Sequence, residues 1–266
     1  MPDACASLGM YDSPALRTAN DALWGEIARR LTARGIADVP PALDRHRPLE
    51  AIWRDPGLLL AQVCGYPLVN AYRGHLRYLA TPHYRAQGCE GASYRSRIVV
   101  RADEPATALA ELRGSRAAVN EWQSNSGMNL LRATVAPLAR GTPFFDAVTQ
   151  TGSHLGSVRA VADGAAEVAA IDTVSFVHIA RDDPALAARV RTIAWSEPSP
   201  GLPFVTSLAT PEPVAEALVS VLGEVVRGAE ARAACTALLI ADVEHLPSQA
   251  YDGLADPAFG ADRGRL

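Results

Sequence analysis

Short apolar runs alternate with segments of helical periodicity along most of this chain. Residues 58–63 and 168–171 are runs of the first kind, whereas residues 211–226 place apolar side chains three or four positions apart. A brief continuous apolar run suits a buried strand, and a spacing of 3.6 residues suits a helix with one buried face. Strands and helices that alternate in this way build sheets covered by helices, so the sequence predicts an α/β protein.

The strands and helices expected from this pattern cover most of the chain. The expected strands are 4–10, 58–63, 98–101, 117–120, 147–150, 168–171, 190–195 and 205–209. The expected helices are 14–34, 105–112, 126–139, 155–162, 173–180, 211–226 and 231–241. Ser13 is the predicted N-cap of the first helix, with Pro14 at its first position and Gly35 just past its end.

The order of these elements predicts two lobes. Residues 99–197 have a strand–helix rhythm of their own, and extended segments near Val99 and Glu197 lead into and out of them. We therefore expect a discontinuous lobe I (1–98 and 198–266) and an inserted lobe II (99–197). Each would be a mostly parallel sheet flanked by helices, and the two crossing strands would form a hinge. Proteins of this kind close on a ligand in the cleft between the lobes.

Composition excludes several classes of function. The net charge of −4 provides no basic face for a nucleic acid. All 25 basic residues are arginine, and without lysine there is neither Schiff-base catalysis nor a Walker-type phosphate loop. No segment approaches the ~18 apolar residues of a membrane span. No secretory signal precedes Leu8, so the chain is expected to be a cytoplasmic copy or one whose signal was removed before numbering.

The four cysteines indicate no metal centre. Cys5, Cys64, Cys89 and Cys235 form no CxxC pair, which argues against zinc and against a thioredoxin-like motif. Cys64 and Cys89 could form a disulfide in an exported protein, or both could be buried thiols. We expect no metal and no cofactor.

The strongest local motif lies ahead of an apolar helix and has the sequence Ser124-Asn125-Ser126-Gly127. The first N–H groups of a helix lack acceptors within the helix, and hydroxyls on the same turn add further donors. Together they can hold an oxyanion without a formal positive charge. Ser126 could instead be only an N-cap.

A second strand-to-helix turn, residues 151–154, also carries hydroxyls and ends in His154. A histidine there can donate to an oxyanion or titrate near neutral pH. Asp172, at the end of the strand 168–171, could accept from a ligand amine or hydroxyl, or could cap the next helix. The carboxyl ends of strands in an open α/β sheet are where ligands bind, so we expect these turns to contribute to one site.

The order of five motifs resembles the phosphonate-binding (PhnD-like) family of substrate-binding proteins, from about Leu8 to Ala209. Those motifs are Leu8-Gly9-Met10-Tyr11-Asp12, Gln62-Val63-Cys64-Gly65-Tyr66-Pro67, Ser124-Asn125-Ser126-Gly127, Gly152-Ser153-His154, and Val161-Ala162-Asp163-Gly164 followed by Ile171-Asp172. The resemblance implies a type 2 periplasmic binding protein fold. It also implies a protein that binds a small anionic ligand, such as phosphonate or phosphate, for an ABC permease in the periplasm. We expect this protein to be a monomer.

The same resemblance implies a role for each motif in the ligand site. Ser124, Ser126, Gly127 and His154 would hold the oxyanion, and Asp172 would meet a hydroxyl or an amine. Tyr66 would close over the ligand from lobe I, where Met10, Tyr11, Cys64 and Gly65 would line the cleft. Asn125 stands where the family leads us to expect a small hydroxyl residue, and Cys64 and Gly65 stand where its better-known members are more polar, so the identity of the ligand stays open.

Two other functions remain compatible with this sequence. An enzyme on the same scaffold would use His154 and Asp172 as an acid–base pair, but no GxSxG motif supplies a nucleophile. A cytoplasmic sensor would signal by closing on its ligand. We expect a binding protein and no catalysis.

Overall fold

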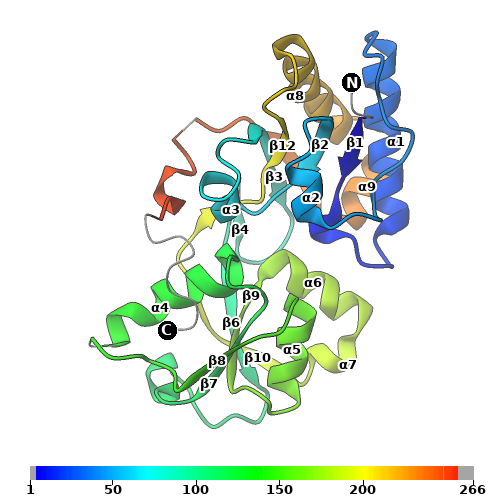
Figure 1. Cartoon of the computed structure of the whole chain (residues 1–266). Helices are drawn as coiled ribbons and strands as arrows, with labels where there is room; N and C mark the ends of the chain where they lie inside the picture. Colours follow the sequence, from blue (N-terminus) through cyan, green and yellow to red (C-terminus); the bar gives the residue numbers. More distant parts are fainter. Residues whose placement is uncertain (1–3, 140, 248, 257–266) are drawn as a thin grey trace. The chain divides into compact units, whose positions relative to one another are not determined.

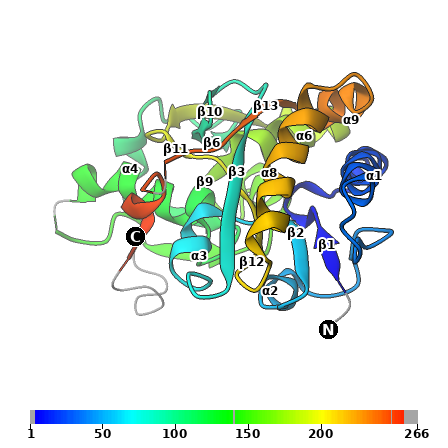
Figure 2. The same cartoon turned by 90° about the horizontal axis from the view of Figure 1, so that it is seen from above.

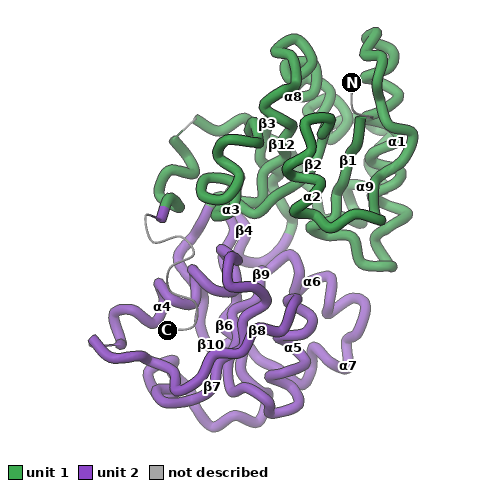
Figure 3. Tube along the Cα trace, viewed as in Figure 1, with its two compact units in different colours: residues 1–85, 90–92, 200–255 green, residues 86–89, 93–199, 256–266 purple. Residues whose placement is uncertain are grey.

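The computed structural model describes residues 4–139, 141–247 and 249–256, which fall into two compact units. Within this part of the chain, unit 1 comprises residues 4–85, 90–92 and 200–255, and unit 2 comprises residues 86–89, 93–199 and 256 (Figure 3). Residues 257–266, at the end of the predicted lobe I, lie outside the described residues.

Unit 1 is built on a five-stranded mixed sheet in the order β1-β2-β12-β3-β13 (Figure 1). These strands are β1 (Cys5–Ser7), β2 (Leu58–Gln62), β12 (Phe204–Ser207), β3 (Leu76–Tyr84) and β13 (Ile240–Glu244). β1 and β2 are parallel, whereas β12 is antiparallel to both β2 and β3, and β13 is antiparallel to β3. β12, which follows unit 2 in the sequence, is therefore the middle strand of this sheet, between β2 and β3.

Three helices of unit 1 contact one another and cover this sheet. They are α1 (Arg17–Ala33), α8 (Glu212–Arg227) and α9 (Arg232–Ala237). Figure 2 shows α8 running beside β3, where its apolar side chains, among them Leu218 and Leu222, are fully buried. A second buried cluster contains residues of α2 (Leu49–Trp53), β2 and α3 (Gly65–Val69). The 3-10 helices η1 (Gly9–Tyr11) and η4 (Asp252–Leu254) complete the unit.

Unit 2 contains a second mixed sheet, in the order β10-β6-β9-β7-β8. These strands are β10 (Val190–Trp195), β6 (Ser96–Arg101), β9 (Val168–Asp172), β7 (Arg116–Val119) and β8 (Ala147–Gln150). β7 is parallel to β8 and β9, whereas β6 is antiparallel to β9 and β10. Three two-residue strands form a small third sheet on the segments that cross between the units: β4 (Cys89–Glu90), β5 (Ser93–Tyr94) and β11 (Ser199–Pro200).

Helices cover both faces of the unit 2 sheet because its strands are apolar on both faces. Ile98 and Val100 of β6 belong to the core under α4 (Leu130–Ala139). Val99 between them belongs to the core under α5 (His154–Ala162), α6 (Thr173–Asp182) and α7 (Pro184–Ala187). Two further turns, η2 (Leu109–Leu112) and the π-helix η3 (Asn125–Asn129), precede β7 and α4 respectively. The alternation of Ile98, Val99 and Val100 between the two cores follows from the period of two of side chains along a strand.

The predicted α/β class is confirmed, while several elements differ from the prediction. The parallel pairings expected in both lobes are β1–β2, β7–β8 and β7–β9, whereas the other pairings of the two five-stranded sheets are antiparallel. Helix α1 begins at Arg17 without a side-chain cap, so Ser13 is not its N-cap. The expected helix 105–112 is only the short turn η2. The expected helix 231–241 ends at Ala237, and Leu239, with φ of 63°, leads into β13.

Candidate functional site

The segment Ser124–Gly127 forms the start of a helix in unit 2. Ser124 is its N-cap, and the Ser124 Oγ accepts a hydrogen bond from the Gly127 N–H at 3.0 Å. The next turn is a π-helix, in which the Asn129 N–H reaches back to the Ser124 carbonyl at 3.1 Å. π-turns are uncommon and occur frequently at functional sites. Ser124 therefore has the capping role, and its hydroxyl lies on the same turn as that of Ser126.

Ser126 and His154 come together although they are 28 residues apart in sequence. The Ser126 Oγ lies 2.9 Å from His154 Nε2 and 3.3 Å from the Ser124 Oγ. The Ser126 backbone is held in turn by Ser96 of β6, whose hydroxyl donates to the Ser126 carbonyl at 2.9 Å. His154 is the first residue of α5, so the side chains of two helix starts meet here. We call Ser124, Ser126 and His154 the Ser–His cluster.

The two serines of the Ser–His cluster are buried, whereas His154 is partly exposed, and the cluster carries no formal charge at neutral pH. Ser124 and Ser126 are 6% and 4% exposed, respectively. Burial lowers the pKa of His154 to about 4, so the imidazole is neutral near pH 7. His154 Nδ1 is also buried, with no hydrogen-bond partner in the described part of the chain.

Two asparagines next to the cluster each hold a buried side-chain oxygen that accepts no hydrogen bond from any described residue. Asn125 donates through Nδ2 to the hydroxyls of Tyr94 and Ser199, at 3.0 and 2.8 Å, whereas its Oδ1 is without a donor. Asn120 follows β7, and its Oδ1 lies directly against Gly127, where a Cβ would collide with it. Sequence reasoning missed Asn120, although its place after a strand matched the signal used for Asp172.

Asp172 serves as the N-cap of α6. Its Oδ1 accepts from the Ser175 N–H at 2.7 Å, and the residue is only 2% exposed. The helix cap is therefore one role of this carboxylate. The pKa of the Cys89 thiol is raised to about 12, chiefly by burial and in smaller part by the negative charge of Asp172.

The predicted ligand residues near the N-terminus lie in unit 1, on η1. Asn20 of α1 fixes this turn, because its Nδ2 donates to the Tyr11 carbonyl at 2.8 Å and to Asp12 Oδ1 at 2.9 Å. Tyr11 and Tyr84 make an edge-to-face contact with ring centroids 5.5 Å apart. Met10 instead packs against the buried cluster that contains β2.

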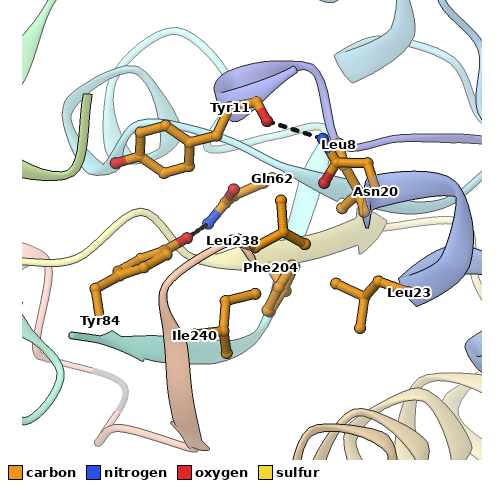
Figure 4. Close-up of a pocket in the computed structure, with 9 residues that line it drawn as sticks. All are labelled: Leu8, Tyr11, Asn20, Leu23, Gln62, Tyr84, Phe204, Leu238 and Ile240. Atoms are coloured by element: carbon orange, nitrogen blue, oxygen red, sulfur yellow. Dashed lines mark hydrogen bonds between the residues drawn. The ribbon is translucent and has the colours of Figure 1, made fainter. Parts of the chain in front are cut away.

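Tyr11 also lines a small pocket within unit 1 (Figure 4). Its polar edge is Gln62, whose Nε2 donates to the Tyr84 hydroxyl at 2.8 Å and to the Leu202 carbonyl at 2.9 Å. The remaining lining is largely apolar and comprises Leu8, Asn20, Leu23, Phe204, Leu238 and Ile240. The space is of the order of a single water molecule, so this pocket is too small for an organic ligand.

Cys64, Gly65 and Tyr66 form the start of α3 in unit 1, and all three are buried. Asn70 holds this helix to the chain near the C-terminus, since its Nδ2 donates to the Tyr66 carbonyl at 2.7 Å and to the Leu254 carbonyl at 2.9 Å. Tyr251 anchors the same region through its hydroxyl, which donates to the Gly201 carbonyl at 2.8 Å. Tyr66, which the family resemblance led us to expect over the ligand, is 6% exposed.

Replacing Gly65 by Ala is expected to lower the free energy of unfolding by about 1–3 kcal/mol, the usual cost of overpacking a core. A Cβ at this position would lie 2.8 Å from Cδ1 of Tyr251 and 2.9 Å from Cδ1 of Leu254. Urea denaturation measures the change. Gly74→Ala is the matched control, because nothing lies within 4 Å of its Cβ position. Equal midpoints for the two variants would contradict this packing.

The described residues were also compared with the requirements for a disulfide, a metal site and a membrane span. The thiols of Cys5, Cys64, Cys89 and Cys235 form no disulfide with one another. The described residues contain no group of three or more metal-ligating side chains close enough to hold an ion. Within the same residues, every helix is too short or too polar to span a bilayer.

Comparisons with known proteins place this geometry in a family. Residues 58–251 match the family described as ABC transporter, phosphonate, periplasmic substrate-binding protein. A search of curated protein sequences returned no match.

Several solved structures are similar to this one. PhnD1 from Prochlorococcus marinus (MIT 9301), in complex with methylphosphonate, has a TM-score of 0.73 and 13% identity, over 96% of this chain and 96% of that one. XAC2383 from Xanthomonas citri, bound to chloride ion, has a TM-score of 0.71 and 18% identity, over 94% and 95%. A binding protein component of an ABC phosphonate transporter from Pseudomonas aeruginosa has a TM-score of 0.71 and 14% identity, over 93% and 82%.

These likenesses establish the fold, which is that of type 2 periplasmic binding proteins, as the sequence predicted. The family match covers most of the chain and includes both Ser126 and His154. The chain therefore belongs to the phosphonate-binding (PhnD-like) family of ABC-transporter periplasmic substrate-binding proteins.

Proposed function

We propose that this protein captures a small tetrahedral oxyanion, such as a phosphonate or phosphate, and delivers it to an ABC permease. The observation that carries the proposal is the 2.9 Å contact between Ser126 Oγ and His154 Nε2, at the meeting of two helix starts. The serine hydroxyls supply hydrogen-bond donors at this place, and the dipoles of the two helices favour an anion there. Family membership independently supports an anionic ligand.

We propose that the protein acts in the periplasm, the compartment that the family description names, and that it acts there as a monomer. Asn125 and Gly127 would complete the oxyanion site, and the Asp172 carboxylate would meet a ligand hydroxyl or amine. The residues of unit 1 proposed to contact the same ligand are Met10, Tyr11, Cys64, Gly65 and Tyr66. A tyrosine suits such a contact because its ring covers an apolar group while its hydroxyl reaches an oxygen.

The Ser126–His154 pair resembles a nucleophile and its base, but its environment favours binding over catalysis. A base works best with a pKa near the operating pH, and burial holds that of His154 at about 4. In serine hydrolases a carboxylate orients the second ring nitrogen. Here no described residue bonds His154 Nδ1. We therefore propose that the pair binds its ligand unchanged.

Thermal unfolding with candidate ligands tests the proposed function. At about 100 times its dissociation constant, a ligand stabilises the folded protein by about 2.7 kcal/mol. For a chain of this size that raises Tm by roughly 5–10 °C. We expect methylphosphonate, phosphate or phosphite to produce this shift, and uncharged glycerol to produce none. Failure of every tetrahedral oxyanion to raise Tm at millimolar concentration would contradict the proposal.

A further inference from the structure

The hydrogen bonds of the Ser–His cluster form a single chain that ends on a ring nitrogen. The Gly127 N–H donates to the Ser124 Oγ, which lies 3.3 Å from the Ser126 Oγ, which in turn lies 2.9 Å from His154 Nε2. Each hydroxyl supplies one hydrogen. In the tautomer of His154 that carries its hydrogen on Nδ1, with both hydroxyl hydrogens pointing along the chain, Nε2 is the acceptor. An oxyanion that accepts from both serines turns these hydrogens away, so Nε2 loses its donor and faces a negative charge.

No cation compensates that charge within the described residues near the cluster. The charged and titratable groups on α4, on α5 and on the elements packed against α5 are Arg132, Arg159, Arg97, Arg101, Arg116, Asp172, His178, Arg181, Asp182 and Arg191. None of them contributes to the pKa of His154, for which burial is the sole cause. On β6, Arg97 donates to the Thr173 hydroxyl at 3.1 Å.

We infer that His154 takes up a proton when a dianionic oxyanion binds, so that the site holds the ligand as an ion pair between imidazolium and dianion. This inference rests on the proposed function. Burying a dianion among neutral donors alone is costly, whereas an adjacent opposite charge offsets that cost. Proton uptake at Nε2 also gives this nitrogen a hydrogen that it can donate to the ligand, in place of the hydrogen bond that it accepted from Ser126. One proton on Nε2 therefore does two things: it gives this nitrogen a hydrogen bond again, and it provides the positive charge that faces the anion.

The sign of the pH dependence follows from this uptake. Free His154 is neutral at pH 7, because burial lowers its pKa, and in the complex the adjacent dianion raises that pKa. Binding therefore consumes one proton where the free ligand is a dianion. By linkage, affinity for methylphosphonate falls about tenfold for each unit that pH rises above the second pKa of the ligand.

Titration calorimetry with methylphosphonate measures the proton directly. The wild type is titrated well above the second pKa of the ligand, in two phosphate-free buffers with different enthalpies of ionisation. We expect the two binding enthalpies to differ by the difference between the ionisation enthalpies of the two buffers, multiplied by about one proton per site. Equal enthalpies in both buffers would overturn the inference and leave the proposed function standing. Absence of binding in both buffers would overturn the proposed function itself.

Two variants locate the proton. His154→Gln keeps a donor but cannot be charged, so we expect weaker binding with no proton uptake. His46→Gln removes an exposed histidine of unit 1 and should take up the same proton as the wild type. Undiminished uptake in His154→Gln would overturn the assignment to His154. If that variant binds too weakly to titrate, imidazole ¹⁵N shifts of the ligand-bound wild type decide: an imidazolium at residue 154 supports the inference and a neutral ring overturns it.

Discussion

Replacing Ser126 by Ala is expected to weaken methylphosphonate binding by about ten- to a hundredfold while the fold survives. The Ser126 hydroxyl is one of two in the Ser–His cluster and contacts His154 at 2.9 Å. A hydrogen bond to a charged acceptor at a buried site is worth about 1.5–3 kcal/mol, which corresponds to this loss. Titration calorimetry of the variant gives the dissociation constant, and circular dichroism checks that the fold is retained.

The matched control is Ser220→Ala, which removes an exposed hydroxyl of α8 that donates to Glu224 at 2.9 Å. Its affinity should equal that of the wild type. Removing Ser126 leaves the backbone of the turn in place, because Ser96 bonds the carbonyl and Ser124 caps the helix. Unchanged affinity in Ser126→Ala would show that the ligand binds elsewhere.

Gly88→Ala is expected to lower the free energy of unfolding by about 2–5 kcal/mol, the largest effect on stability that we predict. Two causes combine at this residue, which lies in unit 2 next to β4. Its φ of 93° is strained for any residue with a Cβ, and a Cβ there would collide with the ring of Trp195. That ring also stacks on Arg97, whose Cζ lies 4.6 Å from the ring centroid, so the collision would disturb two contacts.

Gly91→Ala separates the two causes. Gly91 also has a positive φ, 54°, but nothing lies within 4 Å of its Cβ position. We expect it to cost only about 1 kcal/mol, the strain of the backbone alone. Urea denaturation of both variants measures the difference. If Gly88→Ala cost no more than Gly91→Ala, the close contact between residue 88 and Trp195 would be wrong.

Much of the fold was predictable because burial imposes a period on the sequence. In unit 2, β8 and β10 coincide with the predicted residues 147–150 and 190–195. β3 was missed because Arg77, Pro82 and His83 interrupt its apolar pattern, although it pairs with both β12 and β13. The order in which β12 and β13 join the sheet depends on contacts far apart in sequence, which local periodicity does not encode.

The Ser-rich turn and His154 were predictable from the sequence for a local reason. Both lie in hydroxyl-rich turns that precede a helix. Helix capping favours such turns, and they can be recognised from a few neighbouring residues. Their 2.9 Å contact was less accessible, because it depends on β7 and β8 lying side by side in parallel. Asn120 was missed for the same reason, since only the folded turn brings it against Gly127.

The most direct test of the central claim is the imidazole NMR spectrum of the wild type during a titration with methylphosphonate. Spectra of His154→Gln and His46→Gln assign the two resonances. Binding at the Ser–His cluster predicts that the His154 signals shift and saturate with the ligand, toward the imidazolium position, while those of His46 stay in place. His154 signals that remain unmoved at ligand concentrations that saturate the calorimetric binding would contradict the claim.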